Sequence, residues 1–141
     1  MDVSHALKLA SIKELKILSN VRLINRHDLN SVNSHKNLHV QFALSGEVQG
    51  SMTCYLCLDR HKLTQTDKNY IFPLFVESMN ILVGKQLSLN QQVKIRLSPP
   101  RLSMISQLIN TSEKSGMQHY DLQLDGQTFS VLTESTIEIL N

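Results

Sequence analysis

The segment from Ile71 to Gly84 constrains the fold most, because it is almost continuously apolar over several helical turns. At the helical step of about 100° per residue, the apolar side chains cover a very wide arc. A helix here must be buried on most sides, for example between a sheet and another element. The remaining narrow sector holds Pro73, Glu77, Asn80 and Gly84. Glu77 and Asn80 are therefore predicted to be neighbours that point out of the core.

The ends of this helix follow from its capping residues. Thr64, Thr66 and Asp67 precede it and are residue types that favour helix N-caps. Gly84 is placed to cap the C-terminus, so the helix is predicted to stop there. Pro73 lacks a backbone N–H, which predicts either a start near residue 72 or a kink.

Two β-hairpins are predicted on either side of this helix. The first consists of alternating strands at 38–44 and 48–58, joined by a tight turn at Ser45–Gly46–Glu47. The second joins Tyr120–Leu122–Leu124 to Phe129–Val131 through Asp125–Gly126, a dipeptide that strongly favours hairpin turns.

An earlier amphipathic helix is predicted from Asp2 or Ser4 to about Leu18, from the spacing of its apolar residues. Together these elements predict one α+β domain over residues 1–141. Its sheet is expected to be mostly antiparallel, with two long helices packed on it.

Composition and charge argue against several functions. The formal net charge is only +2, Lys and Arg are scattered, and Trp is absent, so we expect no nucleic-acid partner. No apolar run has the length of a membrane span and the N-terminus has no signal-peptide core, so we expect a cytoplasmic protein. Cys54 and Cys57 are expected to be buried free thiols, because positions three apart on a strand face opposite sides and would not converge on zinc.

The polar pair is also the centre of a family resemblance. Glu77–Ser78–Met79–Asn80, followed by Gly84, resembles the Glu-x-x-Asn motif of the CheX/CheC/FliY chemotaxis phosphatases. The hairpin around Gly46 and Gly50 is similar to the glycine-marked strand pair of that family. Strand 93–97 leading into Pro99–Pro100 resembles the strand and proline that follow the motif. The resemblance spans about residues 38–105, and the single motif copy makes the chain more similar to CheX than to CheC.

This resemblance implies hydrolysis of the aspartyl-phosphate of a CheY-like response regulator, with Glu77 and Asn80 as the catalytic residues. It also implies a homodimer. The Mg²⁺ would be carried by the regulator, so the chain is expected to need no cofactor or metal ligands of its own.

Two other interpretations remain open from the sequence. The family often has Asp or Ser four residues before the Glu, where this chain has Pro73, and the interval from Asn80 to Pro99 is shorter than usual. Both departures favour a non-catalytic binding or adaptor module on the same fold, acting in two-component or motor-switch signalling. A dimerisation module that associates through its sheet would make the polar pair incidental.

Overall fold

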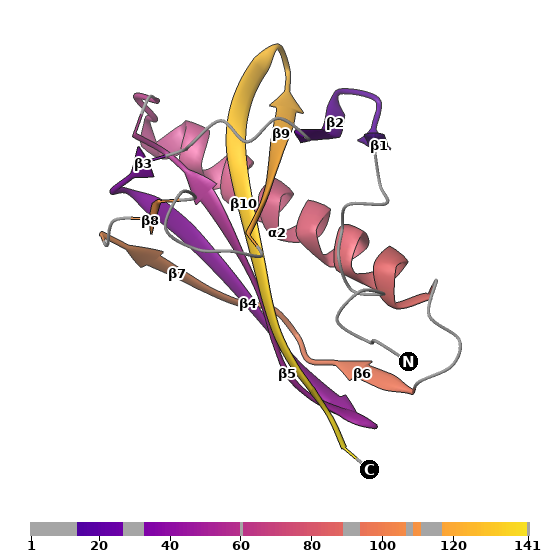
Figure 1. Ribbon diagram of the computed structural model, residues 1–141. Coiled ribbons are helices and arrows are strands. Elements are labelled where there is room, and N and C mark those ends of the chain that lie inside the picture. The colour runs from indigo at the N-terminus through magenta and orange to yellow at the C-terminus, as the bar shows by residue number, and fades with distance from the viewer. Residues whose placement is uncertain are drawn as a thin grey trace.

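The structure is a computed structural model that describes residues 14–26, 33–59, 61–88, 94–106, 109–110 and 117–140. Within these residues one helix lies against a large, strongly twisted antiparallel sheet (Figure 1). The elements are β1 (Glu14–Leu18), β2 (Val21–Arg26), β3 (Asn33–Ser34), β4 (Asn37–Gly46), β5 (Val48–Cys57), α2 (Gln65–Ser88), β6 (Ile95–Leu97), β7 (Arg101–Ile105), β8 (Ile109–Asn110), β9 (Gln118–Leu124) and β10 (Gln127–Ile139).

The large sheet has the strand order β1-β2-β9-β10-β5-β4-β6, and β7 also pairs with β4. Both predicted hairpins are confirmed: β4 pairs with β5, and β9 pairs with β10. In the second hairpin Asp125 and Gly126 have φ values of 46° and 82°. A turn with two consecutive positive φ values matches the twist of the flanking strands, which is why Asp-Gly is favoured there.

The predicted fold class, with two long helices packed on the sheet, is wrong for the part of the chain that the structure describes. Residues 14–18, which were expected to end the first helix, form strand β1 and pair with β2. In β1, exposed Glu14 and Lys16 alternate with buried Leu15 and half-buried Ile17, and this two-residue period is that of a strand. Over so short a segment, helical and strand periods predict nearly the same apolar positions. The rest of the predicted first helix, residues 2–13, lies outside the described residues.

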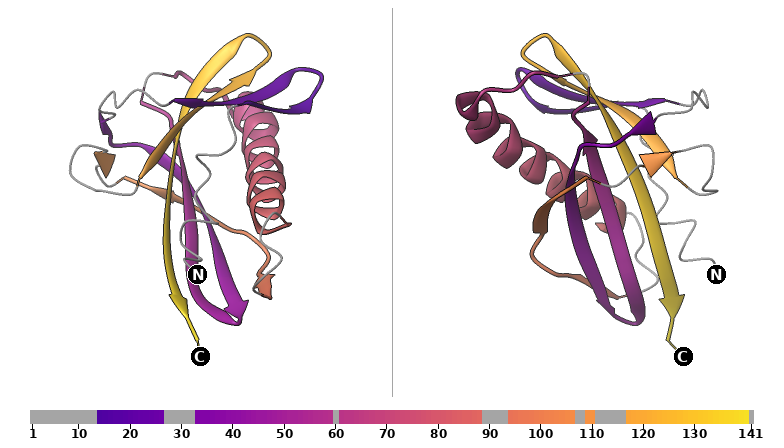
Figure 2. Two further views of the ribbon diagram at one scale, coloured as in Figure 1. Left: turned by 45° about the vertical axis from the view of Figure 1, so that its right-hand side comes forward. Right: turned by 90° about the vertical axis from the view of Figure 1, so that its left-hand side faces the viewer.

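The main core lies between α2 and the concave face of the curled sheet (Figure 2). The large strands contribute their alternate residues to this face, and α2 contributes one side of its surface. Burial of this apolar area is the principal force that holds the helix on the sheet. The fully buried side chains with the largest volumes are Tyr120, Phe42, Phe75, Phe129, Leu23, Leu38, Met52, Leu56, Leu58 and Met79.

Helix α2 begins with a reciprocal cap. The Thr64 hydroxyl accepts a hydrogen bond from the Asp67 backbone N–H at 3.1 Å, and the Asp67 carboxylate accepts one from the Thr64 N–H at 3.0 Å. The predicted cap before the helix is confirmed at Thr64, so of the two alternatives given for Pro73 the start near residue 72 is wrong. The predicted stop at Gly84 is also wrong, because α2 runs from Gln65 to Ser88 with Pro73 inside it. Pro73 is on the exposed side of the helix, where water can bond the carbonyl group that loses its N–H partner. No helix in the described ranges is long and apolar enough to cross a lipid bilayer.

Alanine substitution is expected to have opposite effects on stability at two glycines, Gly50 and Gly84. A Cβ atom at Gly50 in β5 would lie 1.9 Å from the backbone oxygen of Thr136 in the paired strand β10, whereas a Cβ atom at Gly84 would meet nothing within 4 Å. We expect Gly50→Ala to lower the free energy of unfolding by about 1–3 kcal/mol, because the backbone of β10 would have to move. Gly84→Ala should raise it by roughly 0.5–1 kcal/mol, because alanine is the better helix former.

Urea unfolding monitored by circular dichroism measures both changes in the free energy of unfolding. Gly84→Ala is the control for adding a methyl group without a backbone clash. Equal effects of the two substitutions would contradict the close packing of β5 against β10.

Candidate functional site: a polar pair beside an apolar groove

Glu77 and Asn80 are both exposed on α2, one turn apart. The side chains that face the sheet are buried and follow the helical period; they are Ile71, Phe75, Ser78, Met79, Leu82 and Val83. The prediction that Glu77 and Asn80 point away from the core is therefore confirmed. At a spacing of three residues, their Cβ atoms are about 5–6 Å apart on a helix, close enough to act on one partner group.

The two residues between the pair anchor this turn in the core. Ser78 and Met79 are both fully buried. The Ser78 hydroxyl donates a 2.6 Å hydrogen bond to the carbonyl oxygen of Leu74, one turn earlier, which satisfies its buried polar group. The backbone that carries Glu77 and Asn80 is consequently held on its inner side while their side chains reach solvent.

A groove opens beside the N-terminal half of the same helix. Its volume is about 590 Å³, and it lies between α2 and strand β7. Apolar side chains dominate its walls, and Lys68 is the charged residue among the described ones that line it. The residues that line it are Gln65, Lys68, Asn69, Phe72, Pro73, Leu102 and Met104.

Strand β7 places Leu102 and Met104 on the helix side of the sheet. Leu102 is opposite Val40 of β4 and Met104 is opposite Leu38, and both β4 residues belong to the main core. Directly paired residues project from the same face of a sheet. Because β7 lies outside β4, its two side chains extend this face beyond the cover of α2, and they are 48% and 47% exposed.

A hydrogen-bonded group fixes the N-terminal half of α2 to two turns of the sheet. The Tyr70 hydroxyl donates to the Asp125 carboxylate at 3.1 Å and accepts from the Asn20 amide at 3.2 Å. Asn20 also donates to Asp125, and its backbone oxygen accepts from the Asp125 N–H. The turn between β1 and β2, the turn between β9 and β10 and the helix are thereby joined, which holds the groove wall in position.

The two cysteines do not form a site with the polar pair. Cys54 is in the main core, and Cys57 packs in a small cluster on the opposite face with Tyr55 and Leu132. Their predicted placement on opposite sides of β5 is confirmed, and both are free thiols. Burial raises the pKa of the Cys54 thiol to about 12 and that of Cys57 to about 11, so neither is a thiolate at neutral pH. The described residues contain no group of three or more His, Cys, Asp or Glu that could hold a metal ion.

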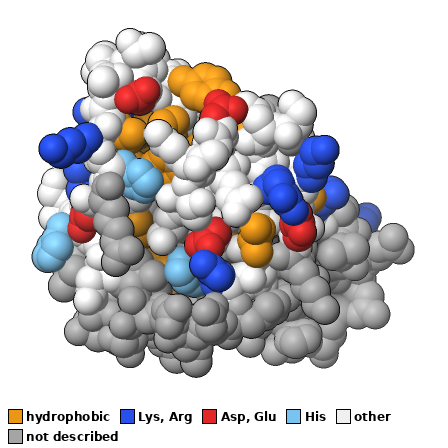
Figure 3. Space-filling view, turned by 90° about the horizontal axis from the view of Figure 1, so that it is seen from above, with side chains coloured by type: hydrophobic (Ala, Val, Ile, Leu, Met, Phe, Trp, Pro, Cys, Tyr) orange, Lys and Arg blue, Asp and Glu red, His pale blue; other side chains and the backbone are white. Residues whose placement is uncertain are grey.

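The sequence identified the polar pair but not the groove. Leu102 and Met104 alternate with Arg101 and Ser103, a pattern that predicts a half-buried strand and gives no sign that its apolar side would be open. Among the described residues on the face seen from above, acidic and basic side chains are interspersed, without a large area of one sign (Figure 3).

Comparisons with known proteins give a structural likeness. No protein-family model matches the chain, and neither does any curated protein sequence. The chain is similar to a chain in the crystal structure of a CheX–CheY complex with BeF₃ and Mg²⁺ from Borrelia burgdorferi. The TM-score is 0.45 and the sequence identity is 14%, over 95% of this chain and 93% of that chain. An identity this low assigns no residue roles.

Proposed function

We propose that this protein is a phosphatase that hydrolyses the aspartyl-phosphate of a CheY-like response regulator in chemotaxis or two-component signalling. The observation that carries the proposal is that Glu77 and Asn80 are both exposed on one turn of α2, while the inner side of this helix is buried. This is the arrangement that a Glu-x-x-Asn motif needs to reach into another protein's active site. The groove beside it offers additional surface on the same side of the helix.

The chemistry requires little from this chain except positioning. Water attacks the phosphorus atom, the bond from phosphorus to the aspartyl oxygen breaks, and the products are inorganic phosphate and a free carboxylate. The proton released by the water is taken up by the phosphate. The side-chain oxygen of Asn80 would accept a hydrogen bond from the water and hold it in line with the breaking bond. The divalent cation that such a regulator binds at its phosphorylation site would supply charge neutralisation.

Glu77 would fix the orientation of the complex. Its carboxylate is exposed and would pair with a lysine of the regulator, which sets the docking register. The residues assigned to the reaction are therefore Glu77 for docking and Asn80 for the water. The test of the function is the rate at which a phosphorylated CheY-like regulator loses its phosphate, with and without this protein.

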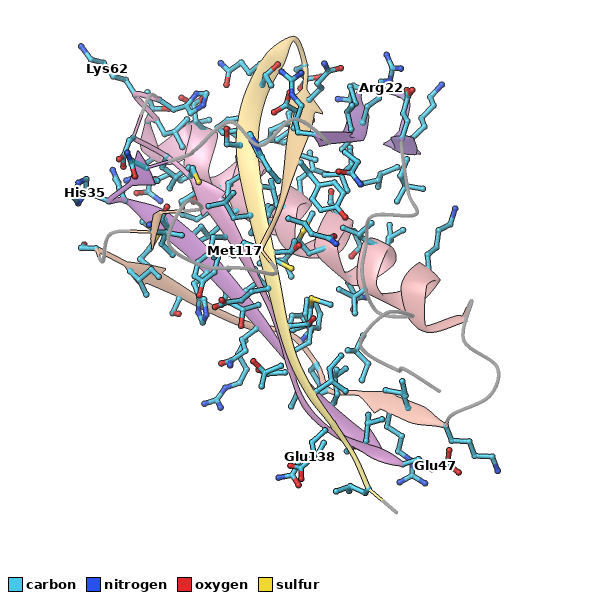
Figure 4. All side chains as sticks on the ribbon, viewed as in Figure 1. Arg22, His35, Glu47, Lys62, Met117 and Glu138 are labelled. Carbon is cyan, nitrogen blue, oxygen red and sulfur yellow. The ribbon has the colours of Figure 1, made fainter. Side chains whose placement is uncertain are left out.

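Glu77→Ala is expected to impair both binding and hydrolysis. Loss of the carboxylate should raise the dissociation constant for the regulator by about tenfold, because a lysine in the interface would lose its partner. The measurement is titration of a fluorescently labelled regulator in its beryllofluoride form, together with the phosphate decay rate. Glu138→Ala is the matched control, since Glu138 is also exposed but lies at the far end of the sheet (Figure 4). Sedimentation checks that this control keeps the wild-type oligomeric state. Equal effects of the two substitutions would exclude a specific role for Glu77.

A non-catalytic adaptor on the same fold is the second candidate, and Pro73 is the observation that favours it. Pro73 is exposed one turn before Glu77, where the resembling family often has Asp or Ser, so this position adds no polar group to the site. An adaptor would bind the regulator tightly and leave its phosphate decay rate unchanged. The same decay measurement therefore separates the two candidates.

The proposal includes a homodimer, and the open part of β10 supports it. Residues 127–133 of β10 pair with β9 on one side, whereas among the described residues the part from Ser135 to Ile139 pairs with β5 alone. An open strand edge of this kind can pair with a second copy. Sedimentation equilibrium measures the oligomeric state directly.

A further inference from the structure

Two of the strongly exposed large hydrophobic side chains in the described part of the chain lie together at one place. The exposed large hydrophobic residues there and elsewhere are Tyr70, Leu102, Met104 and Leu140. Leu102 and Met104 lie together in the groove against Phe72 and Pro73 of α2. Clustered apolar side chains of this kind usually mark a binding surface, whereas single ones do not.

The groove is continuous with the polar pair. Pro73 lines the groove and is one helical turn from Glu77, on the same exposed stripe. A specific protein–protein interface covers roughly 800 Å² on each partner, and the two side chains of one helical turn provide only a small part of this. A partner seated over Glu77 and Asn80 must therefore extend along the neighbouring surface, and on the N-terminal side that surface is the groove.

The charges along this surface favour one orientation of the bound partner. Among the described residues that line the groove, Lys68 is charged and none is acidic. Glu77 is nine residues further along α2, which is about 14 Å along a helix axis. A complementary partner carries an acidic group near the groove and a basic group near Glu77, with apolar surface next to the acid.

We propose that the groove between α2 and β7 is the docking site for a bulky apolar side chain of the response regulator, flanked by a carboxylate that pairs with Lys68. This inference rests on the regulator-binding part of the proposed function. The groove supplies affinity through burial of apolar surface, and the pair one turn away acts on the phosphorylated aspartate. Well-packed apolar anchors of this kind carry much of the free energy of an interface.

The test is a double variant, Leu102→Ser with Met104→Ser, in the full chain. Both side chains are exposed, so the substitutions should leave folding intact, and thermal unfolding checks this. We expect the dissociation constant for the beryllofluoride form of a CheY-like regulator to rise about tenfold or more. In the phosphate decay assay, KM should rise by a similar factor and kcat should change by less than about twofold, because the water-positioning residue Asn80 is untouched.

Leu140→Ser is the matched control. Leu140 is 47% exposed, as Met104 is, but it follows β10 at the opposite end of the sheet. Sedimentation checks that this variant keeps the wild-type oligomeric state, and it should bind the regulator as the wild type does. Lys68→Glu is a second, independent variant, which should weaken binding, and more so at low ionic strength than at high.

The possible outcomes separate this inference from the proposed function. If the wild-type protein neither binds the regulator nor accelerates its dephosphorylation, the proposed function and the docking site both fail. If the wild type is active and the double variant and Lys68→Glu keep its KM and dissociation constant, only the docking site fails. A double variant that turns a dimer into a monomer would identify the groove as a contact between copies and would likewise overturn the inference.

Discussion

Replacing Asn80 with alanine is expected to reduce the dephosphorylation rate at saturating regulator by about 100-fold or more. The amide that would hold the attacking water is lost, and misplacement of a reacting group by even about 1 Å has effects of this size. Binding should weaken by less than about tenfold, because Glu77 and the groove remain. Asn80 is exposed, and alanine favours the helix, so the fold should be unchanged.

Single-turnover decay of the phosphorylated regulator measures this effect separately from binding. Gln49→Ala is a suitable control, because it removes an exposed amide from strand β5, away from α2. Full activity of Asn80→Ala in a protein whose wild type is active would refute the proposed mechanism. A rate that falls only in proportion to binding would assign Asn80 to docking instead.

The largest effect on stability is expected from Phe75→Ala. Phe75 is fully buried in the core between α2 and the sheet, one turn from Met79. Removal of a buried aromatic ring leaves a cavity and typically costs about 3–5 kcal/mol. Because total stabilities are only about 5–15 kcal/mol, the variant should unfold at a much lower urea concentration.

Phe72→Ala is the comparison for this substitution. Phe72 has the same side chain on the same helix but is only partly buried, at the edge of the core and in the groove wall. Its loss should cost less than half as much as the loss of Phe75. If the two substitutions cost the same, the assignment of the inner and outer faces of α2 would be wrong.

Features that depend on a few neighbouring residues were predicted well. The outward placement of Glu77 and Asn80 follows from the helical repeat alone, since neighbouring turns fix which side chains share a face. The hairpin at Asp125–Gly126 follows from the local preference of these residues for positive φ. Local patterns gave the wrong structure for residues 14–18, because a short helix and a short strand place their apolar residues at nearly the same positions. They also gave the wrong ends for elements whose ends depend on packing. Helix α2 continues past Gly84 because the buried residues before it hold the chain on the sheet, which outweighs a weak stop signal.

The sequence by itself determined that a helix displays Glu77 and Asn80, and it suggested what chemistry this pair could perform. The predicted burial of this helix on most sides is wrong, because only the side that faces the sheet is buried. Only the tertiary structure decided what lies beside them. Leu102 and Met104 are about thirty residues from Phe72 and Pro73 along the chain, and they meet because β7 pairs with the outer edge of β4. Strand pairing between distant segments depends on the whole sheet, so neither the groove nor its exposure is encoded in any local pattern.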